Sequence, residues 1–254
     1  MALANRFAVR HLLTLLAIAP ALAAIGCGGE SQGPNPAAAC GAAPPAGGAV
    51  LAIFSRPFAG DFQLVNYFDH DLPIQQSGNE FQLTTCGERV TGRLDGHGGY
   101  DWLLPSGTPL LATSDGTVVF AGVEAPGYCA VLGRTVSDQL VVSMRSEGSD
   151  RYDSQYLHLS RVDVAAGDQV TRGQVLGLSG NTGCSTEPHL HFQVRTVDGP
   201  NPGALIDPYG WAGDGPDPWA LDPNGAASVW LWQEGEAPGL DVGTVRKGGT
   251  GQEG

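Results

Sequence analysis

Basic residues are scarce in this chain, and they form no cluster. Lysine and arginine together account for 13 of its 254 residues, against 26 acidic residues, so the formal net charge is −13. A protein that binds nucleic acid by neutralising phosphates needs a basic patch or stripe. The composition therefore argues against a nucleic-acid partner and favours a soluble protein that works outside the cytoplasm.

Long amphipathic segments are also missing. No segment shows an apolar period of 3.6 residues, and the 38 glycines and 18 prolines favour turns over helices. Short apolar or alternating runs bounded by turn residues are typical of strands at sandwich or barrel spacing. Such runs lie at 49–54, 116–121, 140–144, 174–178 and 191–195. We therefore predict an almost all-β domain of antiparallel sheet with little helix.

Several common catalytic signatures are absent. The chain has no His-Glu-x-x-His, which argues against a helix-based zinc peptidase, and no Gly-x-Ser-x-Gly or Walker A sequence. It also has no Cys-x-x-Cys pair, which disfavours a zinc site made of thiolates.

The N-terminus has the pattern of an export signal. A short basic region precedes an apolar stretch, Leu12–Ile25, that is too short for a comfortable transmembrane helix. The sequence Ala24-Ile-Gly-Cys27 then resembles a bacterial lipobox, although leucine is usual where Ala24 stands. We expect residues 1–26 to be a lipoprotein signal peptide and Cys27 to be lipidated. The alternative is a simple cleaved signal with an incidental Cys27.

Four cysteines remain beyond that position, namely Cys40, Cys86, Cys129 and Cys184. An even number of cysteines in an exported protein favours two disulfides. Three connectivities are open, and the sequence does not choose among them. We take Cys40–Cys86 and Cys129–Cys184 as the working expectation.

The rest of the chain divides into three predicted parts. Residues 27–49 are rich in glycine, alanine and proline and are typical of a flexible tether. Residues 50–215 carry the strand pattern and form the predicted domain. Residues 216–254 form a tryptophan-containing extension that ends in a frayed tail.

Four histidines fall into three short motifs: His97-Gly-Gly-Tyr-Asp101, Tyr156-Leu-His158-Leu159 and His189-Leu-His191. Alternate residues of a strand point to one face, so His189 and His191 can enter one site, and Tyr156 is expected to share a face with His158. The glycines after His97 allow a backbone that brings it to the same ion as Asp101. Taken alone, the histidines of any one motif would be interpreted as ordinary surface or core residues. Together they supply three zinc ligands, an open position for water, and two further histidines that can move protons.

The remaining histidine outside the leader lies in Asp69-His70-Asp71. This segment could hold a second cation, but a polar loop is the better interpretation.

The motifs and their surroundings resemble the lysostaphin-like zinc endopeptidases of family M23, the LytM-type peptidoglycan hydrolases. The resemblance runs from about Gly92 to Val194, and an ordered series of motifs of this kind is far more specific than any one of them. Besides the histidine motifs, it includes Gly107–Ala112, Asp115–Val118, Gly167–Val170, Gly173–Gly177, Gly180–Gly183 and Pro188–Phe192. The small residue that is usual before Pro188 is Glu187 here.

The resemblance implies a lysostaphin-like domain with a loop-walled groove over one Zn²⁺. It implies that His97, Asp101 and His191 hold the metal and that His158 and His189 are the unligated catalytic pair. Tyr156 and Asn181 are candidate substrate contacts, with strand packing and a turn as their alternative roles. The implied activity is cleavage of peptide cross-links in bacterial peptidoglycan, and we expect the protein to be a monomer.

Other readings stay open at this point. Some LytM-like proteins lack metal ligands and activate other wall hydrolases without catalysis, but the five site residues are all present here. An active enzyme could face the periplasm or cell surface on a lipid anchor and remodel its own wall, or it could be secreted and lyse other bacteria. The scissile bond, D-Ala–diaminopimelate or Gly–Gly, is not decided by the sequence.

Overall fold

The computed structural model describes residues 41–72, 81–91, 94–148 and 152–240, which all lie within the unit Pro34–Gly254. Strands supply nearly all of its regular structure, and α2 (Pro218–Leu221) is the only helix in the described part. No helix among these residues has the length and hydropathy needed to cross a bilayer. The predicted signal peptide, Cys27 and Cys40 lie outside the described residues, as does the end of the predicted tail.

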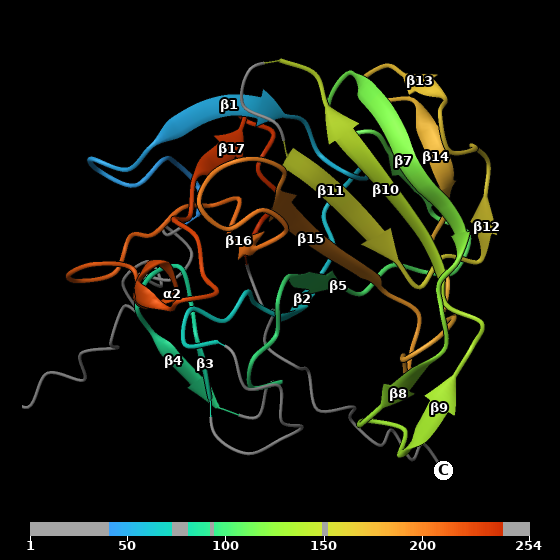
Figure 1. The fold of residues 1–254 in the computed structure, drawn as a ribbon, viewed down its shortest axis with the longest axis horizontal. Helices are drawn as coiled ribbons and strands as arrows, with labels where there is room; N and C mark the ends of the chain where they lie inside the picture. The colour runs from blue at the N-terminus through green and yellow to red at the C-terminus, as the bar shows by residue number, and fades with distance from the viewer. Residues whose placement is uncertain (1–40, 73–80, 92–93, 149–151, 241–254) are drawn as a thin grey trace, which may run out of the picture. The chain divides into compact units, whose positions relative to one another are not determined.

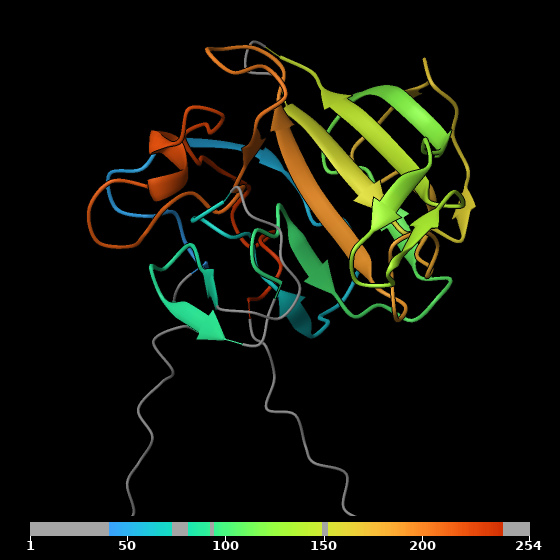
Figure 2. The ribbon, with the colours of Figure 1, turned by 60° about the horizontal axis from the view of Figure 1, so that its bottom comes forward.

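The largest sheet has eight strands and positions the candidate site. All of its pairs are antiparallel, and its central strands run side by side in both ribbon views (Figures 1 and 2). The order across the sheet is β13 (Gln169–Val170), β7 (Gly116–Val123), β10 (Leu140–Ser146), β11 (Tyr152–Leu157), β15 (Leu190–Thr196), β5 (Tyr100–Trp102) and β2 (Leu64–Asn66), with β16 (Leu205–Ile206) paired to β15.

Four smaller sheets surround it. A three-stranded sheet contains β12 (Arg161–Val162), β14 (Val175–Leu178) and β6 (Pro109–Leu111), and two hairpins join β3 (Phe81–Leu83) to β4 (Arg89–Thr91) and β8 (Gly127–Cys129) to β9 (Arg134–Val136). The fourth pairs β1 (Val50–Phe54) with β17 (Trp230–Trp232) in parallel. Each of the five predicted strand runs overlaps a strand, so the prediction of an almost all-β antiparallel fold is confirmed.

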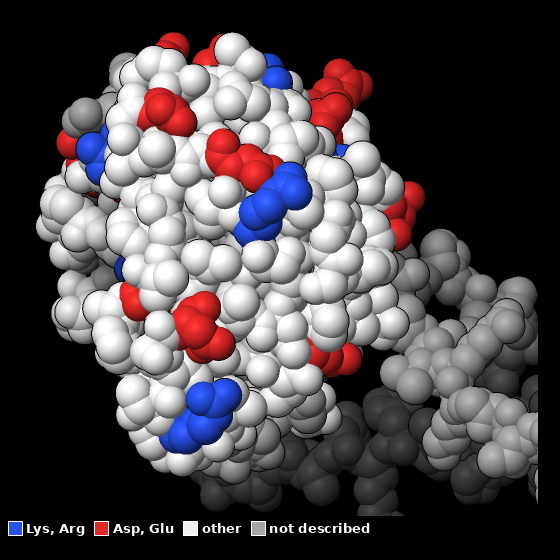
Figure 3. All heavy atoms as spheres, turned by 90° about the vertical axis from the view of Figure 1, so that its right-hand side faces the viewer, with Lys and Arg blue, Asp and Glu red and all other residues white. Residues whose placement is uncertain are grey.

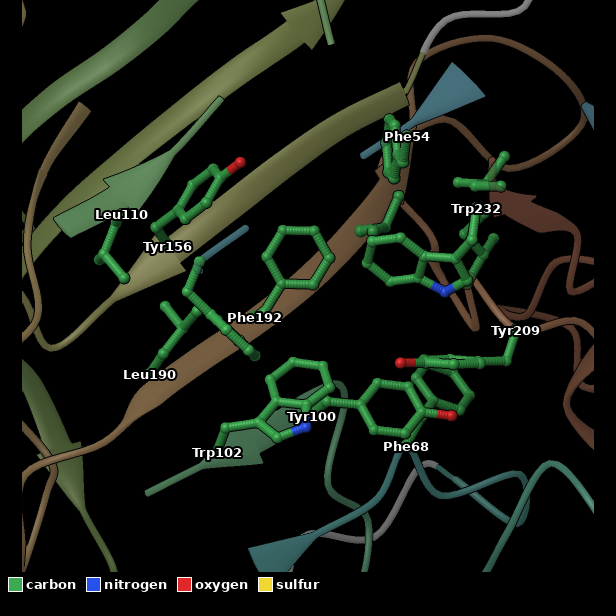
Figure 4. Packing of buried hydrophobic residues seen from close by; sticks show 14 of the residues in the cluster. Phe54, Phe68, Tyr100, Trp102, Leu110, Tyr156, Leu190, Phe192, Tyr209 and Trp232 are labelled. Carbon is green, nitrogen blue, oxygen red and sulfur yellow. The ribbon is translucent and has the colours of Figure 1, made fainter. Parts of the chain in front are cut away.

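The core lies against one face of the large sheet. On β15, Leu190, Phe192 and Val194 point into it and are fully buried, as are the rings of Tyr100 and Trp102 on β5. Figure 4 shows Leu190, Phe192, Tyr100 and Trp102 packed with other large aromatic rings. Burial of such rings is the main favourable term in the stability of the domain. The alternation leaves the intervening β15 side chains on the opposite face, where the candidate site lies.

The described C-terminal residues complete this core. Trp230 and Trp232 of β17 are buried, and the ring of Trp232 lies 5.9 Å from that of Phe192 and 6.0 Å from that of Phe54. The part of the predicted extension that the structure describes, residues 216–240, thus packs on the same core as residues 50–215. The domain boundary itself stays a prediction.

The surface agrees with the scarcity of basic residues. On the face in Figure 3, lysine and arginine side chains are isolated and acidic side chains are scattered among uncharged ones. This face offers no basic patch for a phosphate backbone.

Candidate metal centre and groove

Two neighbouring strands bring Asp101 and His191 together. Asp101 on β5 pairs directly with His191 on β15 in the antiparallel register. His97 precedes β5, and Gly96 allows the chain to turn there because it adopts a φ of +71°. A Cβ atom at Gly99 would lie 2.4 Å from the backbone oxygen of Phe192, so only glycine lets this segment pass so close to β15.

Three ligand atoms of these residues converge. The distance from His97 Nε2 to His191 Nδ1 is 3.0 Å, that from His97 Nε2 to Asp101 Oδ2 is 3.1 Å, and that from His191 Nδ1 to Asp101 Oδ1 is 2.8 Å. All three residues are largely buried. A tetrahedral zinc with bonds of about 2.0–2.1 Å places its ligands about 3.3 Å apart. The donor set and its spacing therefore fit one such ion.

Each of the three is oriented by a second hydrogen bond. His97 Nδ1 lies 2.8 Å from the backbone oxygen of Tyr67, and His191 Nε2 lies 3.0 Å from Gln193 Oε1. Because both partners accept, the facing ring nitrogens donate, and the converging nitrogens keep their lone pairs. Asn66 Nδ2 donates to Asp101 Oδ2 over 2.7 Å. Partners of this kind fix ligand orientation at metal sites.

The charge on Asp101 is strongly favoured. Burial alone would raise its pKa, but the neighbouring His97 and His191 hold the pKa well below its usual value. The carboxylate is therefore ionised throughout the neutral range and is ready to bind a cation.

The other two histidines lie beside this cluster. The rings of His158 and His189 are 4.5 Å apart, and His189 Nε2 lies 3.7 Å from Asp101 Oδ1. His158 Nδ1 donates to the backbone oxygen of Thr182 and His189 Nδ1 to that of Glu187, both over 2.8 Å. Each ring therefore has its Nε2 free to accept a proton.

His158 is neutral and its backbone is strained. Burial, followed by repulsion from His189 and His191, lowers the pKa of His158 to about 3. Its φ of +66° lies in the left-handed region, which residues other than glycine rarely adopt. Strain of this type is often found at functional sites.

A groove of about 440 Å³ lies over all five residues. Tyr128 on β8 and Val131 in the turn between β8 and β9 line one part of the groove. Residues 184–187 line another part of it. The disulfide Cys129–Cys184 joins these two walls, and this is the pairing expected from the sequence. Cys86 is also disulfide-bonded.

The structure places Tyr156 in the core and not in the lining of the groove. Its side chain is fully buried among the core residues (Figure 4). Its hydroxyl donates to the oxygen of Leu111 and accepts from the N–H of Thr113. The expectation that it shares a face with His158 fails because β11 ends at Leu157 and His158 follows with a positive φ. Tyr156 has the alternative role, strand packing.

Asn181 is exposed and does not line the groove. Its Oδ1 accepts from the hydroxyl of Ser185, and that hydroxyl lies 3.0 Å from His189 Nδ1. The structure thus gives Asn181 the alternative role considered above, in the turn that precedes His189. A contact with substrate is untested.

Sequence reasoning missed Gln193, Arg195, Gln155 and Asn66. The first two could have been found, because period-two alternation from His191 places Gln193 and Arg195 on the same face of β15. Asn66 and Gln155 lie on other strands, and only strand pairing brings them near.

The Asp69-His70-Asp71 segment is a polar loop, as expected, but its first two side chains are buried. His70 is fully buried, with Nε2 at 2.8 Å from Asp207 Oδ2 and Nδ1 at 2.8 Å from Asp217 Oδ1. The carboxylates of Asp69, Asp71 and Asp95 do approach within 4.8 Å of one another. However, the N–H groups of Leu83 and Gly96 already donate to Asp69, so its burial needs no ion to explain it.

Comparison with known proteins identifies the same region. Residues 95–208 match the family model described as Peptidase family M23. Peptidoglycan DD-endopeptidase ShyA of Vibrio cholerae is 37% identical over 107 residues, which cover 41% of this chain and 21% of that protein. Glycyl-glycine endopeptidase ALE-1 of Staphylococcus capitis is 40% identical over 100 residues, which cover 39% of this chain and 25% of that protein.

Among solved structures, a zinc-containing peptidase from Vibrio cholerae is 30% identical, with a TM-score of 0.37, and the match covers 57% of this chain and 37% of that one. The chain thus matches only a minor part of the curated relatives' length. The matched residues include all five members of the candidate site. Residues 95–208 of this chain form a domain of peptidase family M23.

Proposed function

We propose that this protein is a zinc-dependent endopeptidase that cleaves peptide cross-links of bacterial peptidoglycan. The observation that carries the proposal is the complete set of three converging ligand atoms and two free imidazole nitrogens in one groove. The names of ShyA and ALE-1, which both describe wall endopeptidases, support the same substrate class.

His97 Nε2, Asp101 and His191 Nδ1 are the atoms that would hold the metal. Zinc bound there would activate a water molecule and polarise the scissile carbonyl. The protein's own part is to turn the ligand atoms toward the ion, because the hydrogen bonds to Tyr67, Gln193 and Asn66 fix the orientation of the two imidazoles and the carboxylate.

His158 and His189 would handle the protons. Their Nε2 atoms can accept the proton of the attacking water, return it to the leaving amine, and donate to the developing oxyanion. The low pKa of His158 means that this ring is neutral before reaction at neutral pH.

The remaining proposals concern where the enzyme works. The predicted signal and Cys27 support an exported lipoprotein that faces the periplasm or cell surface, with free secretion as the alternative. The two named relatives act on different bonds, so both D-Ala–diaminopimelate and Gly–Gly cross-links are candidates. We further propose that the enzyme acts as a monomer.

The test is digestion of purified peptidoglycan by zinc-loaded protein, with mass spectrometry of the released fragments. We expect fragments that disappear with a chelator and with His97→Ala. His189→Ala should keep the zinc and lose the cleavage, whereas Arg161→Met, at an exposed ion pair on β12, should change neither.

A non-catalytic LytM-like regulator is the competing function. The intact ligand set and proton-transfer pair argue against it, because a binding module needs neither. Zinc-loaded wild-type protein that releases no fragment from either type of wall would contradict the enzymatic proposal and favour this one.

A further inference from the structure

A row of polar side chains leads away from His191 across the site face of the sheet. His191, Gln193 and Arg195 alternate along β15, and Gln155 on β11 pairs directly with Gln193. Their burial is intermediate, so the row is partly shielded from water. None of the other roles described above uses Gln155 or Arg195.

Hydrogen bonds connect the row in one direction. Arg195 Nε donates to Gln155 Oε1 over 2.9 Å, and Gln193 Nε2 donates to the same oxygen. Gln193 Oε1 then faces His191 Nε2 at 3.0 Å. A further bond from Arg195 Nη1 to the oxygen of Gly203, 2.9 Å long, holds the guanidinium in place.

The direction follows from the chemistry of arginine. A guanidinium has only donors, so the atom of Gln155 that it meets must be the oxygen. Gln193 can approach that oxygen only with its amide nitrogen, which turns its own oxygen toward His191. That oxygen accepts, so the hydrogen of the neutral imidazole lies on Nε2 and the lone pair of Nδ1 faces His97 and Asp101.

We propose that Arg195 is a positioning residue for the metal centre, acting through Gln155 and Gln193 on the orientation and tautomer of His191. The inference rests on the proposed zinc site but not on the substrate. The Gln155 amide also contacts the Ser143 hydroxyl over 3.4 Å, but a hydroxyl can donate or accept, so without Arg195 the amide loses the donor-only partner that fixes its orientation. Gln193 can then present its nitrogen to His191 Nε2, and two donors would face each other.

The test measures zinc affinity of the full-length protein by competition with a chromogenic chelator, with no peptidoglycan present. Removal of a supporting partner of a metal ligand typically costs about 10- to 100-fold in metal affinity. For Gln193→Met, which lacks the amide, we expect a loss of zinc affinity in this range. Arg195→Met should weaken zinc binding by about 3- to 10-fold. Arg195→Lys keeps a donor for Gln155 Oε1, so it should stay close to wild type. Arg161→Met is the surface control.

A double-mutant cycle separates action through Gln193 from a general structural effect. If Arg195 acts along the row, Arg195→Met has no further effect on zinc affinity in the Gln193→Met background. Equal losses in both backgrounds, or no loss in the wild-type background, would overturn the proposal. Wild-type protein that binds zinc but cleaves no wall would overturn the proposed substrate and leave this inference standing.

Discussion

At the scale of single residues, the site depends on which nitrogen of each imidazole is free. His97, His158, His189 and His191 each donate one ring nitrogen to a neutral carbonyl or amide oxygen of the protein. A neutral acceptor fixes the tautomer without adding another negative charge to the site. Under the proposed function, this arrangement prepares two rings for metal binding and two for proton transfer.

A substitution of Tyr156 tests whether this residue serves the packing of the core or the candidate site. Tyr156→Phe removes the acceptor for the buried N–H of Thr113. An unsatisfied buried donor costs about 1–3 kcal/mol. We therefore expect a loss of unfolding free energy of that size in urea denaturation, with zinc affinity and peptidoglycan cleavage unchanged. A loss of cleavage at full stability would restore the interpretation of Tyr156 as a substrate contact.

The histidines show where period-two reasoning succeeds. It placed His189 and His191 on one side because the strand begins beside them and continues without a break to Thr196. It failed for Tyr156 and His158 because β11 ends at Leu157 and His158 follows with a positive φ, so the alternation of the strand does not reach His158. The three motifs could therefore be predicted to form one site, while the roles of individual neighbours could not.

At the scale of elements, the β8–β9 hairpin and the loop before His189 act as one wall. The disulfide Cys129–Cys184 joins them across 55 residues of sequence. The same loop supplies the backbone oxygens of Thr182 and Glu187, which orient His158 and His189. Movement of the loop would therefore disturb the orientation of both His158 and His189.

The double variant Cys129→Ser, Cys184→Ser tests this coupling and leaves the disulfide of Cys86 intact. A disulfide that closes a loop of this size typically contributes about 2–4 kcal/mol, so the denaturation midpoint should fall. We expect the rate of cleavage to fall more than zinc affinity, because the proposed metal ligands lie on β5, on β15 and in the segment before β5 rather than on this loop. Full cleavage activity in a variant that has lost stability would show that the wall does not position these histidines.

Some elements gave no readable signal in the sequence. β5 is three residues long and all three are buried, so it has no alternation to detect. It nevertheless carries Asp101 and forms part of the site. Longer strands with one exposed face, such as β10 and β15, were predicted because alternation and apolar content agree along them.

At the scale of the whole described unit, long-range contacts join its first and last parts. β1 pairs with β17, and His70 links Asp207 and Asp217, which follow it by 137 and 147 residues. No local pattern predicts such a partner, so the sequence suggested only a polar loop at His70. Asp207 lies near the end of the predicted domain and Asp217 at the start of the predicted extension, and His70 contacts both through buried ion pairs.

These ion pairs predict a pH dependence of stability. Burial alone would lower the pKa of His70, but hydrogen bonds to Asp207 and Asp217 raise it from 6.5 to about 9. A histidine whose pKa is higher in the folded than in the unfolded protein stabilises the fold. This contribution is fully present below the pKa of the unfolded protein and is lost as the pH rises through the pKa of the folded protein. The unfolding free energy should therefore decline between about pH 6.5 and 9, by about 3 kcal/mol from this group.

Urea denaturation from pH 6 to pH 10 measures the effect, and the comparison with His70→Gln isolates it from other titrating groups. The variant should be less stable at neutral pH and should lack this part of the decline, because glutamine carries no proton to lose. Asp217→Asn, which removes only one of the two carboxylates, should show an intermediate slope and serves if His70→Gln does not fold. Equal slopes in wild type and variants would mean that His70 is neutral in the folded protein, so the segment would be held by hydrogen bonds and aromatic packing alone.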